Sequence, residues 1–232
     1  MVGPERVAEG VYRVDAIGLS NAINILLIEG EDGWTLVDTG VASSVGRIGE
    51  ALAGLGAGAG NLRRIFLTHH HNDHTGGLPG VRGFVPEVEI VASEKEAEVI
   101  SGERRMDPSS NPVFRFASRN AKLPTAPMSR VVREGDVVAG FRVVSTPGHT
   151  LGHVSLLRDS DGLLFTADAF GCLPRKIRVG VRKSFCTDPA LAKRSAEKLL
   201  AEEFGTVILA HGKVLRTGAK TRLREVAANC HY

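Results

Sequence analysis

Four histidines and one aspartate fall within six consecutive positions, residues 69–74, directly after the apolar run at residues 65–67. Imidazole and carboxylate groups together suit divalent ions such as zinc, iron and manganese. Five donor groups are more than one tetrahedral zinc takes from so short a stretch, so the cluster indicates two ions. The chain is therefore expected to leave a strand at residue 68 and to turn tightly behind the cluster, where Gly76 and Gly77 permit a sharp turn.

The spacing within the cluster predicts how its side chains point. Alternate residues of an extended segment project to the same side, so His69 and His71 are expected to share one ion while His70 faces away. Asp73 and His74 are adjacent, and a turn before them aims both at a second ion. The alternatives are a solvated polar loop or an expression tag, but tags are terminal and do not interleave aspartate with histidine.

Three later segments repeat one pattern, a strand-like apolar run followed by a metal-capable residue. His149 follows the run at residues 141–145, Asp168 follows residues 163–166, and His211 follows residues 207–209. One such residue alone would be read as a cap or a satisfied polar group. Together with the histidine cluster, the three indicate ligands placed at the C-terminal ends of several strands.

Apolar and alternating runs predict nine strands and four helices. The expected strands are residues 11–14, 23–28, 34–37, 64–67, 88–91, 141–145, 154–157, 163–166 and 207–209. The expected helices are residues 43–55, 93–100, 189–204 and 219–228, the third capped by Asp188 and begun by Pro189. Successive strands at the start and a strand followed by a helix at the end indicate an α/β fold of sheets covered by helices.

Length and composition fit a substantial buried core. The chain has 232 residues, of which 43% are hydrophobic, and it is predicted to form one domain over residues 1–232. One long irregular stretch, residues 101–129, contains four prolines. Loops of this length inside compact domains are usually lids or disordered segments. Because Phe114 and Phe116 give the stretch apolar side chains to pack with, we expect an active-site lid.

Several partner classes are not expected. Three scattered cysteines, Cys172, Cys186 and Cys230, are too few for a disulfide framework and fit a reducing cytoplasm. The N-terminal sequence lacks the pattern of an export signal, and no run of about 18 apolar residues predicts a membrane span. A formal charge of +3 is too mild to imply nucleic acid or membrane partners. A small-molecule substrate is expected, and the formation of a homodimer is left as an open question.

The chain resembles the metallo-β-lactamase superfamily over nearly its whole length. Residues 69–74 are similar to the family's His-x-His-x-Asp-His motif, and residues 146–150 to its second histidine motif. Asp168 is similar to the bridging aspartate, His211 to the last histidine, and residues 38–40 to an early aspartate-bearing turn. The resemblance implies a four-layered αββα sandwich with two metal ions at one edge.

The resemblance also implies a distribution of the ligands between the two ions. His69, His71 and His149 would hold the first ion, Asp73, His74 and His211 the second, and Asp168 would bridge them. Zinc is the expected metal, with iron or manganese as alternatives, and a hydroxide shared by the two ions would be the nucleophile. Asp73 would orient this hydroxide or accept its proton, which makes it the expected catalytic residue.

Three polar residues outside this set have less defined roles. Asp38 has two open roles, to hold a ligand histidine by a hydrogen bond or to form an ordinary turn before Thr39 and Gly40. His70 and His153 are expected to serve packing or hydrogen bonding.

The predicted function is a metal-dependent hydrolase acting on a small ester, thioester, lactone or phosphoester. Zinc β-lactamases generally lack the bridging aspartate, and quorum-sensing lactonases use a tyrosine after it, whereas this chain has only Tyr12 and Tyr232. The chain is closest in character to the hydroxyacylglutathione hydrolase-like members, although residues 166–173 match their pattern only in part.

Three alternatives to the hydrolase remain. One is a mononuclear iron oxidoreductase similar to the persulfide dioxygenases, which would use His69, His71 or His149 together with Asp168. A nuclease of the same fold and a binding module without catalysis are the other two.

A basic interval without any acid separates Asp168 from Asp188. Its cationic residues are Arg175, Lys176, Arg178, Arg182 and Lys183. We expect them to bind a carboxylate, phosphate or sulfate on a small anionic substrate. The alternative is an exposed solubilising loop. The part of this interval that carries the cations, residues 175–183, contains no aromatic residue on which nucleic-acid bases could stack, which disfavours a nuclease.

Overall fold

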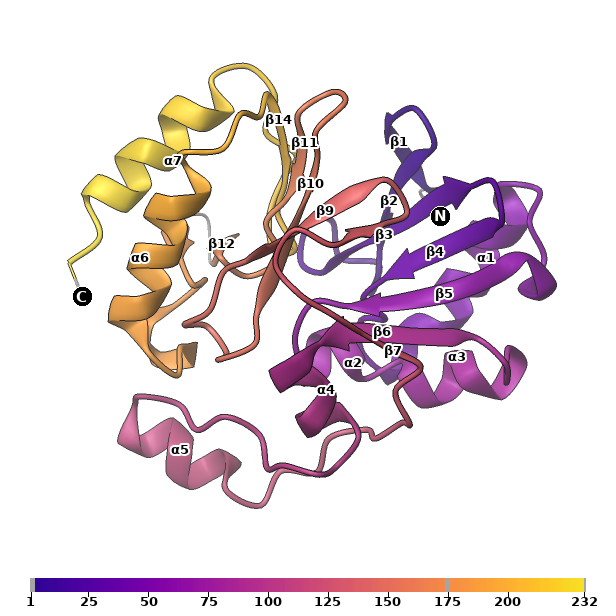
Figure 1. Cartoon of the computed structure of the whole chain (residues 1–232), viewed down its shortest axis with the longest axis horizontal. Coiled ribbons are helices and arrows are strands. Elements are labelled where there is room, and N and C mark those ends of the chain that lie inside the picture. Colours follow the sequence, from indigo (N-terminus) through magenta and orange to yellow (C-terminus); the bar gives the residue numbers. More distant parts are fainter. Residues whose placement is uncertain (1–2, 174–175, 232) are drawn as a thin grey trace. The chain divides into compact units, whose positions relative to one another are not determined.

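The computed structural model describes residues 3–173 and 176–231 (Figure 1). These residues form two compact units. Unit 1 consists of residues 3–105 and 123–132, and unit 2 consists of residues 106–122, 133–173 and 176–231. Each unit has its own sheet and its own hydrophobic core.

Unit 1 contains a seven-stranded sheet in which the strands lie in sequence order. The strands are β1 (Glu5–Ala8), β2 (Val11–Asp15), β3 (Asn24–Gly30), β4 (Gly33–Val37), β5 (Leu62–Leu67), β6 (Glu89–Ser93) and β7 (Arg130–Val132). The first four pair antiparallel, and β4 to β7 pair parallel. Because parallel neighbours need crossover connections, helices lie between β4 and β7 along the chain.

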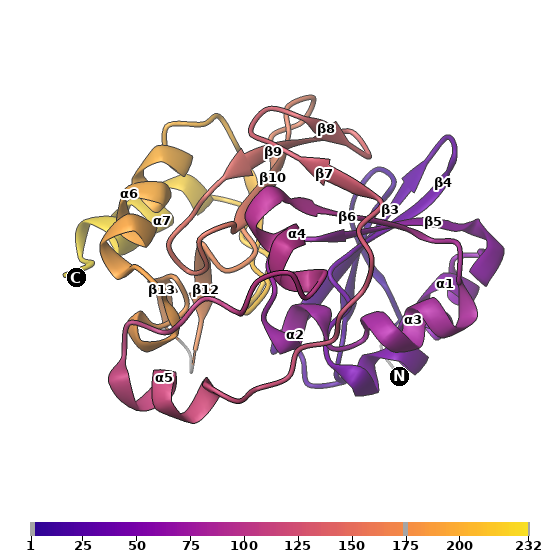
Figure 2. The same cartoon turned by 60° about the horizontal axis from the view of Figure 1, so that its bottom comes forward.

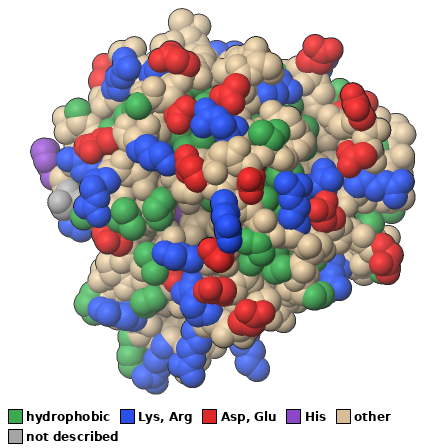
Figure 3. Space-filling view, viewed as in Figure 1, with side chains coloured by type: hydrophobic (Ala, Val, Ile, Leu, Met, Phe, Trp, Pro, Cys, Tyr) green, Lys and Arg blue, Asp and Glu red, His purple; other side chains and the backbone are tan. Residues whose placement is uncertain are grey.

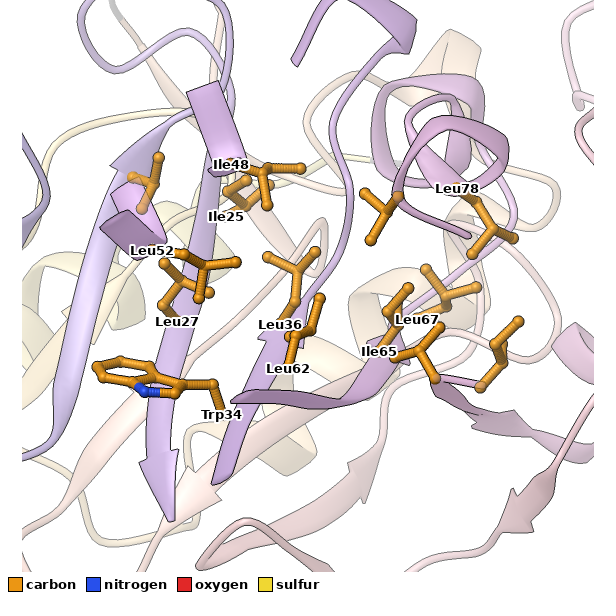
Figure 4. Packing of buried hydrophobic residues seen from close by; sticks show 14 of the residues in the cluster. Ile25, Leu27, Trp34, Leu36, Ile48, Leu52, Leu62, Ile65, Leu67 and Leu78 are labelled. Atoms are coloured by element: carbon orange, nitrogen blue, oxygen red, sulfur yellow. The ribbon is translucent and has the colours of Figure 1, made fainter. Parts of the chain in front are cut away.

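Helices cover one face of this sheet. They are α1 (Val45–Gly54), α2 (Asn72–Thr75), α3 (Leu78–Phe84) and α4 (Glu94–Ile100). Ile25 and Leu27 alternate along β3 and pack towards Ile48 and Leu52, which are four residues apart on α1 and share one helix face (Figure 4). This burial is favourable by about 25 cal/mol per Å² of apolar surface, and it favours the register of β3 that places Ile25 and Leu27 on the buried face.

Unit 2 contains a five-stranded sheet in the order β14-β11-β10-β9-β8 and a separate ribbon of β12 and β13. The strands are β8 (Val137–Val138), β9 (Phe141–Ser145), β10 (Val154–Arg158), β11 (Leu163–Phe165), β12 (Phe170–Cys172), β13 (Ile177–Val179) and β14 (Thr206–Ile208). The longer helices α6 (Pro189–Leu199) and α7 (Ala219–Ala228) lie side by side in both views (Figures 1 and 2). Their apolar faces and the sheet form the second core.

Helix α6 begins as predicted and ends five residues earlier than predicted. The Asp188 side chain accepts a hydrogen bond of 2.9 Å from the Leu191 N–H, and Pro189 occupies the first turn. The expected end at Phe204 is wrong, because the chain tightens after Leu199 through bonds between residues three apart. Phe204 is buried in the core from the irregular segment before β14 instead of from the helix.

All nine expected strands exist, and several short elements were not expected. The unexpected elements are β1, β7, β8, β12, β13, α2, α3 and the 3-10 turns. The stretch 101–129, expected to be irregular, contains the helix α5 (Pro112–Ser118), capped by the Asn111 side chain. Its role as a lid stays a prediction.

Helix α5 is attached to residues 183–186 within unit 2. The Ser110 N–H donates to the Cys186 carbonyl at 2.9 Å, and the ring of Phe114 lies 5.4 Å from that of Phe185. Phe116 is 66% exposed, with the Arg119 guanidinium 4.2 Å from its ring centre. Figure 3 shows Lys and Arg side chains gathered with hydrophobic ones over this segment, at the lower left.

The three cysteines are reduced, and Cys186 and Cys230 are buried. Burial, followed by the negative charge of Asp168, raises the pKa of the Cys186 thiol to about 12, so this thiol is not a nucleophile at neutral pH. None of the helices in the described part of the chain has the length and apolar character needed to cross a membrane.

The cap of α6 gives a prediction about stability. Replacing Asp188→Ala removes the acceptor for the Leu191 N–H and is expected to lower the free energy of unfolding by about 1 kcal/mol. Urea unfolding followed by circular dichroism measures the change. Asp188→Asn retains a capping oxygen and serves as the matched control, so equal losses in both variants would contradict this role.

Candidate metal centre

The histidine cluster lies where β5 ends in unit 1. The strand ends at Leu67, residues 68–71 remain outside regular structure, and α2 begins at Asn72 with His71 as its extended N-cap residue. The rings of His69 and His71 lie 4.9 Å apart, and a donor nitrogen of one lies within 4.8 Å of a donor nitrogen of the other. These two residues therefore form a first pair of donors.

Asp73 and His74 form a second donor pair on α2. His74 Nε2 lies 3.9 Å from Asp73 Oδ2, and the ring of His74 lies 4.0 Å from that of His69. The His74 side chain is buried, whereas that of Asp73 is 38% exposed. The second pair thus combines a fixed imidazole with a carboxylate that solvent can reach.

Asp38 connects the two pairs. Its buried carboxylate lies 2.8 Å from His74 Nδ1 and accepts a hydrogen bond of 2.8 Å from the Thr68 N–H. The Thr68 hydroxyl donates to the same carboxylate and lies 3.1 Å from His69 Nδ1. This contact with His74 is the one that the first of the two expected roles requires, and metal binding by His74 stays a prediction. With Nδ1 occupied by Asp38, Nε2 is the His74 nitrogen suited to bind a metal.

His70 does not belong to either pair. Its Nδ1 lies 2.6 Å from Glu96 Oε2 on α4, and both side chains are fully buried. This contact ties the middle of the cluster to α4 and leaves the residues on either side to form the pairs.

Two backbone features hold α2 in place. Thr39 donates hydrogen bonds from its N–H and its hydroxyl to the His74 carbonyl, at 2.7 and 2.9 Å. A Cβ atom at Gly76 would clash with the Asn72 carbonyl, and one at Gly77 with the Thr39 carbonyl. Glycine is therefore required at both positions by close backbone packing and not by the turn itself, since both residues have helical φ and ψ angles. Thr39 and Thr68 are supporting residues that the sequence alone did not identify.

Unit 2 gathers the three later ligand candidates around one carboxylate. Asp168 Oδ2 lies 3.1 Å from His149 Nε2, and Asp168 Oδ1 lies 3.4 Å from His211 Nε2. His149 Nδ1 is 3.3 Å from the Gly180 carbonyl, which fixes the orientation of the ring. Each of the three residues follows a strand, β9, β11 or β14, as the sequence pattern predicted.

His153 supports Asp168, a role that the sequence did not reveal. The Asp168 N–H donates to His153 Nε2 at 3.0 Å, so the neutral ring carries its proton on Nδ1 and donates it to the Thr146 hydroxyl at 2.9 Å. From there the bonds continue through the Ser155 hydroxyl to the Thr166 carbonyl. The pairing of β10 with both β9 and β11 brings these residues together, so no local spacing could have indicated them.

The donor set in each unit fits a borderline divalent ion. All the candidates are imidazole or carboxylate groups, which zinc, iron and manganese accept. The second nitrogens of His74 and His149 are held by a carboxylate and a backbone carbonyl, the usual outer partners of a metal-binding histidine.

The basic residues expected to bind substrate fall in different places. Lys176 and Arg178 line a hollow beside α7, together with residues of that helix. Arg182 and Lys183 are exposed before and within a short 3-10 turn, and Arg175 lies outside the described residues. Their role in substrate binding stays a prediction.

Curated relatives are similar in sequence. The chain is 28% identical over 212 residues to the uncharacterized protein YobT of Bacillus subtilis, covering 88% of each chain. It is 31% identical over 172 residues to the hydroxyacylglutathione hydrolase of Hahella chejuensis, covering 72% of this chain and 52% of that protein. The chain therefore spans about half the length of this hydrolase.

Solved structures are similar in fold. A metallo-β-lactamase family protein of Thermus thermophilus superposes with a TM-score of 0.71 at 25% identity, over 96% of this chain and 80% of the other. BJP-1, a subclass B3 metallo-β-lactamase of Bradyrhizobium japonicum, gives a TM-score of 0.70 at 20% identity, over 97% and 91%.

The role of Asp38 can be tested by Asp38→Asn, which suits a position with a backbone φ of +60° because asparagine tolerates that conformation. Loss of the anionic acceptor beside His74 is expected to weaken metal binding by about 10- to 100-fold. Competition with a chromogenic chelator measures the affinity. Asp32→Asn, which alters an exposed carboxylate, should keep it, and wild-type affinity in Asp38→Asn would contradict the role.

The family model of the metallo-β-lactamase superfamily matches residues 20–211 of the sequence. This match includes all seven ligand candidates, from His69 to His211. The α/β class and the metallo-β-lactamase fold expected from the sequence are confirmed by the structural neighbours. The chain belongs to the metallo-β-lactamase superfamily.

Proposed function

We propose that this protein is a dinuclear metal-dependent hydrolase that cleaves a small ester, thioester, lactone or phosphoester with activated water. The observation that carries the proposal is the carboxylate of Asp168, which directs one oxygen towards His149 and the other towards His211. A carboxylate that faces two imidazole donors with separate oxygens is suited to bridge two ions.

The proposed ligand set follows the donor pairs of unit 1. One ion would be held by His69, His71 and His149 and the other by Asp73, His74 and His211, and Asp168 would contribute to both. Membership of the superfamily supports this assignment, since these residues stand at the positions of the family's motifs.

The residues around the proposed metal centre have different roles. Two bound divalent ions, with zinc as the expected metal, supply Lewis acidity that lowers the pKa of water and offsets developing negative charge. Asp38 and the Gly180 carbonyl orient the rings of His74 and His149. Asp73, with its partly exposed carboxylate, orients the attacking water and accepts its proton at an Oδ atom.

A thioester is the substrate class with the most support. The relative from Hahella chejuensis is named a hydroxyacylglutathione hydrolase, and a thiolate leaves without protonation by a general acid. Among the three cysteines, Cys186 is excluded as a nucleophile by the raised pKa of its thiol, which is consistent with direct attack by water.

Metal analysis combined with a substrate panel tests the proposal. Purified protein is expected to contain about two divalent ions per chain and to hydrolyse at least one chromogenic ester, thioester, lactone or phosphodiester. Removal of the metal by a chelator should abolish this hydrolysis, and zinc or manganese should restore it. One iron per chain with oxygen consumption would favour the persulfide oxidoreductase instead. A β-lactam belongs in the panel because several structural neighbours are β-lactamases.

Asp73 provides a second test. The variant Asp73→Asn is expected to lower kcat by about 100-fold, because asparagine cannot accept the proton of the attacking water. Metal content and kcat are measured on the same sample, so that loss of an ion is separated from loss of proton transfer. Asn72→Ser, at the exposed neighbouring position, is the control. Unchanged turnover with full metal content in Asp73→Asn would remove this residue from the mechanism.

A further inference from the structure

A surface hollow of about 620 Å³ lies within unit 2 between β13 and α7. One wall contains Lys176 and Arg178, and the other contains Arg222 and Val226. None of His149, Asp168 and His211 lines it. The hollow is therefore a feature that the proposed hydrolase does not use.

The geometry of α7 and β13 explains why these side chains line the hollow. Arg222, Val226 and Asn229 recur at intervals of four and three residues, so they occupy one face of α7. Across the hollow, Ile177 and Val179 are buried in β13. The hollow thus has an apolar floor, with charged groups above it on both sides.

The charges on the walls do not balance. Three cations, Lys176, Arg178 and Arg222, face one carboxylate, that of Glu225. Within the described part of the chain neither Lys176 nor Arg222 forms an ion pair, and Arg178 donates to the backbone carbonyls of Leu173 and Lys176. Backbone carbonyls hold the Arg178 guanidinium in place without cancelling its charge, so the hollow has a net positive lining.

We propose that this hollow binds a small organic anion. Its phosphate or carboxylate group pairs with Arg222 and Lys176, and its apolar part covers Ile177 and Val226. The volume lies in the range of about 300–1,000 Å³ that is usual for small-molecule sites. This assignment gives Lys176 and Arg178 a role in anion binding at α7, independent of the reaction at the metal centre.

Titration of the metal-loaded protein with phenylphosphonate, which has no hydrolysable ester bond, tests the site by calorimetry. The variants Arg222→Glu and Lys176→Glu are expected to weaken binding by about tenfold or more, since each replaces an attraction with a repulsion. Arg224→Glu is the matched control, because it makes the same charge change two residues away on the exposed side of α7, outside the hollow.

The outcomes separate this site from the metal centre and from general electrostatics. Binding that is unchanged in Arg222→Glu and Lys176→Glu would place phenylphosphonate elsewhere, including on the metals, and overturn the proposal. Equal weakening in Arg222→Glu and Arg224→Glu would show that binding depends only on the net charge of the protein, which would also overturn the proposal. Benzyl alcohol should bind far more weakly than phenylphosphonate, and equal affinity would show that the hollow does not recognise the anion. Urea unfolding of each variant verifies that the fold is retained.

Discussion

The buried carboxylate of Asp38 is the interaction on which the cluster in unit 1 depends. It accepts hydrogen bonds from the backbone and the hydroxyl of Thr68 and contacts His74 Nδ1, so it joins the end of β4 to the end of β5 and to α2. A φ of +60° costs a residue other than glycine about 1–2 kcal/mol. Charge-assisted hydrogen bonds of this kind are about twice as strong as neutral ones and offset that cost.

A different group performs the corresponding task in unit 2. There the buried Asp168 is itself a candidate ligand, and its backbone N–H is held by the neutral ring of His153. The bonds that pass from His153 through Thr146 and Ser155 to the Thr166 carbonyl cross from β9 and β10 to the end of β11. A change in any of these three side chains is therefore expected to shift Asp168, although none of them is a ligand candidate.

Features that depend on residues close together in the sequence could be predicted, and features that depend on residues far apart in the sequence could not. The strands that end in ligands were predictable because the apolar run and the ligand are neighbours, as in residues 65–74. Helix α3 was not predictable, because Pro79, Gly80 and Gly83 are poor helix formers. Glycine is nevertheless needed at position 80, because a Cβ there would clash with Val45. The ribbon of β12 and β13 consists of two three-residue strands, too short for any periodicity to show.

The supporting contacts were harder still to predict, because they join residues far apart in the chain. Glu96 and His70 are 26 residues apart, and the contact depends on β5 and β6 being parallel neighbours so that α4 begins beside the cluster.

Exposure and chemical type together distinguish Asp73 from the other ligand candidates. His69, His74, His149, Asp168 and His211 are buried and His71 is an intermediately exposed imidazole, whereas Asp73 carries a carboxylate that solvent can reach. A buried ligand that is also held by an outer partner has a fixed position, which suits metal binding. Asp73 lies in the first turn of α2, and its carboxylate is 38% exposed. A carboxylate with access to water can accept a proton and release it to solvent, which is why we propose Asp73 for proton transfer as well as for metal binding.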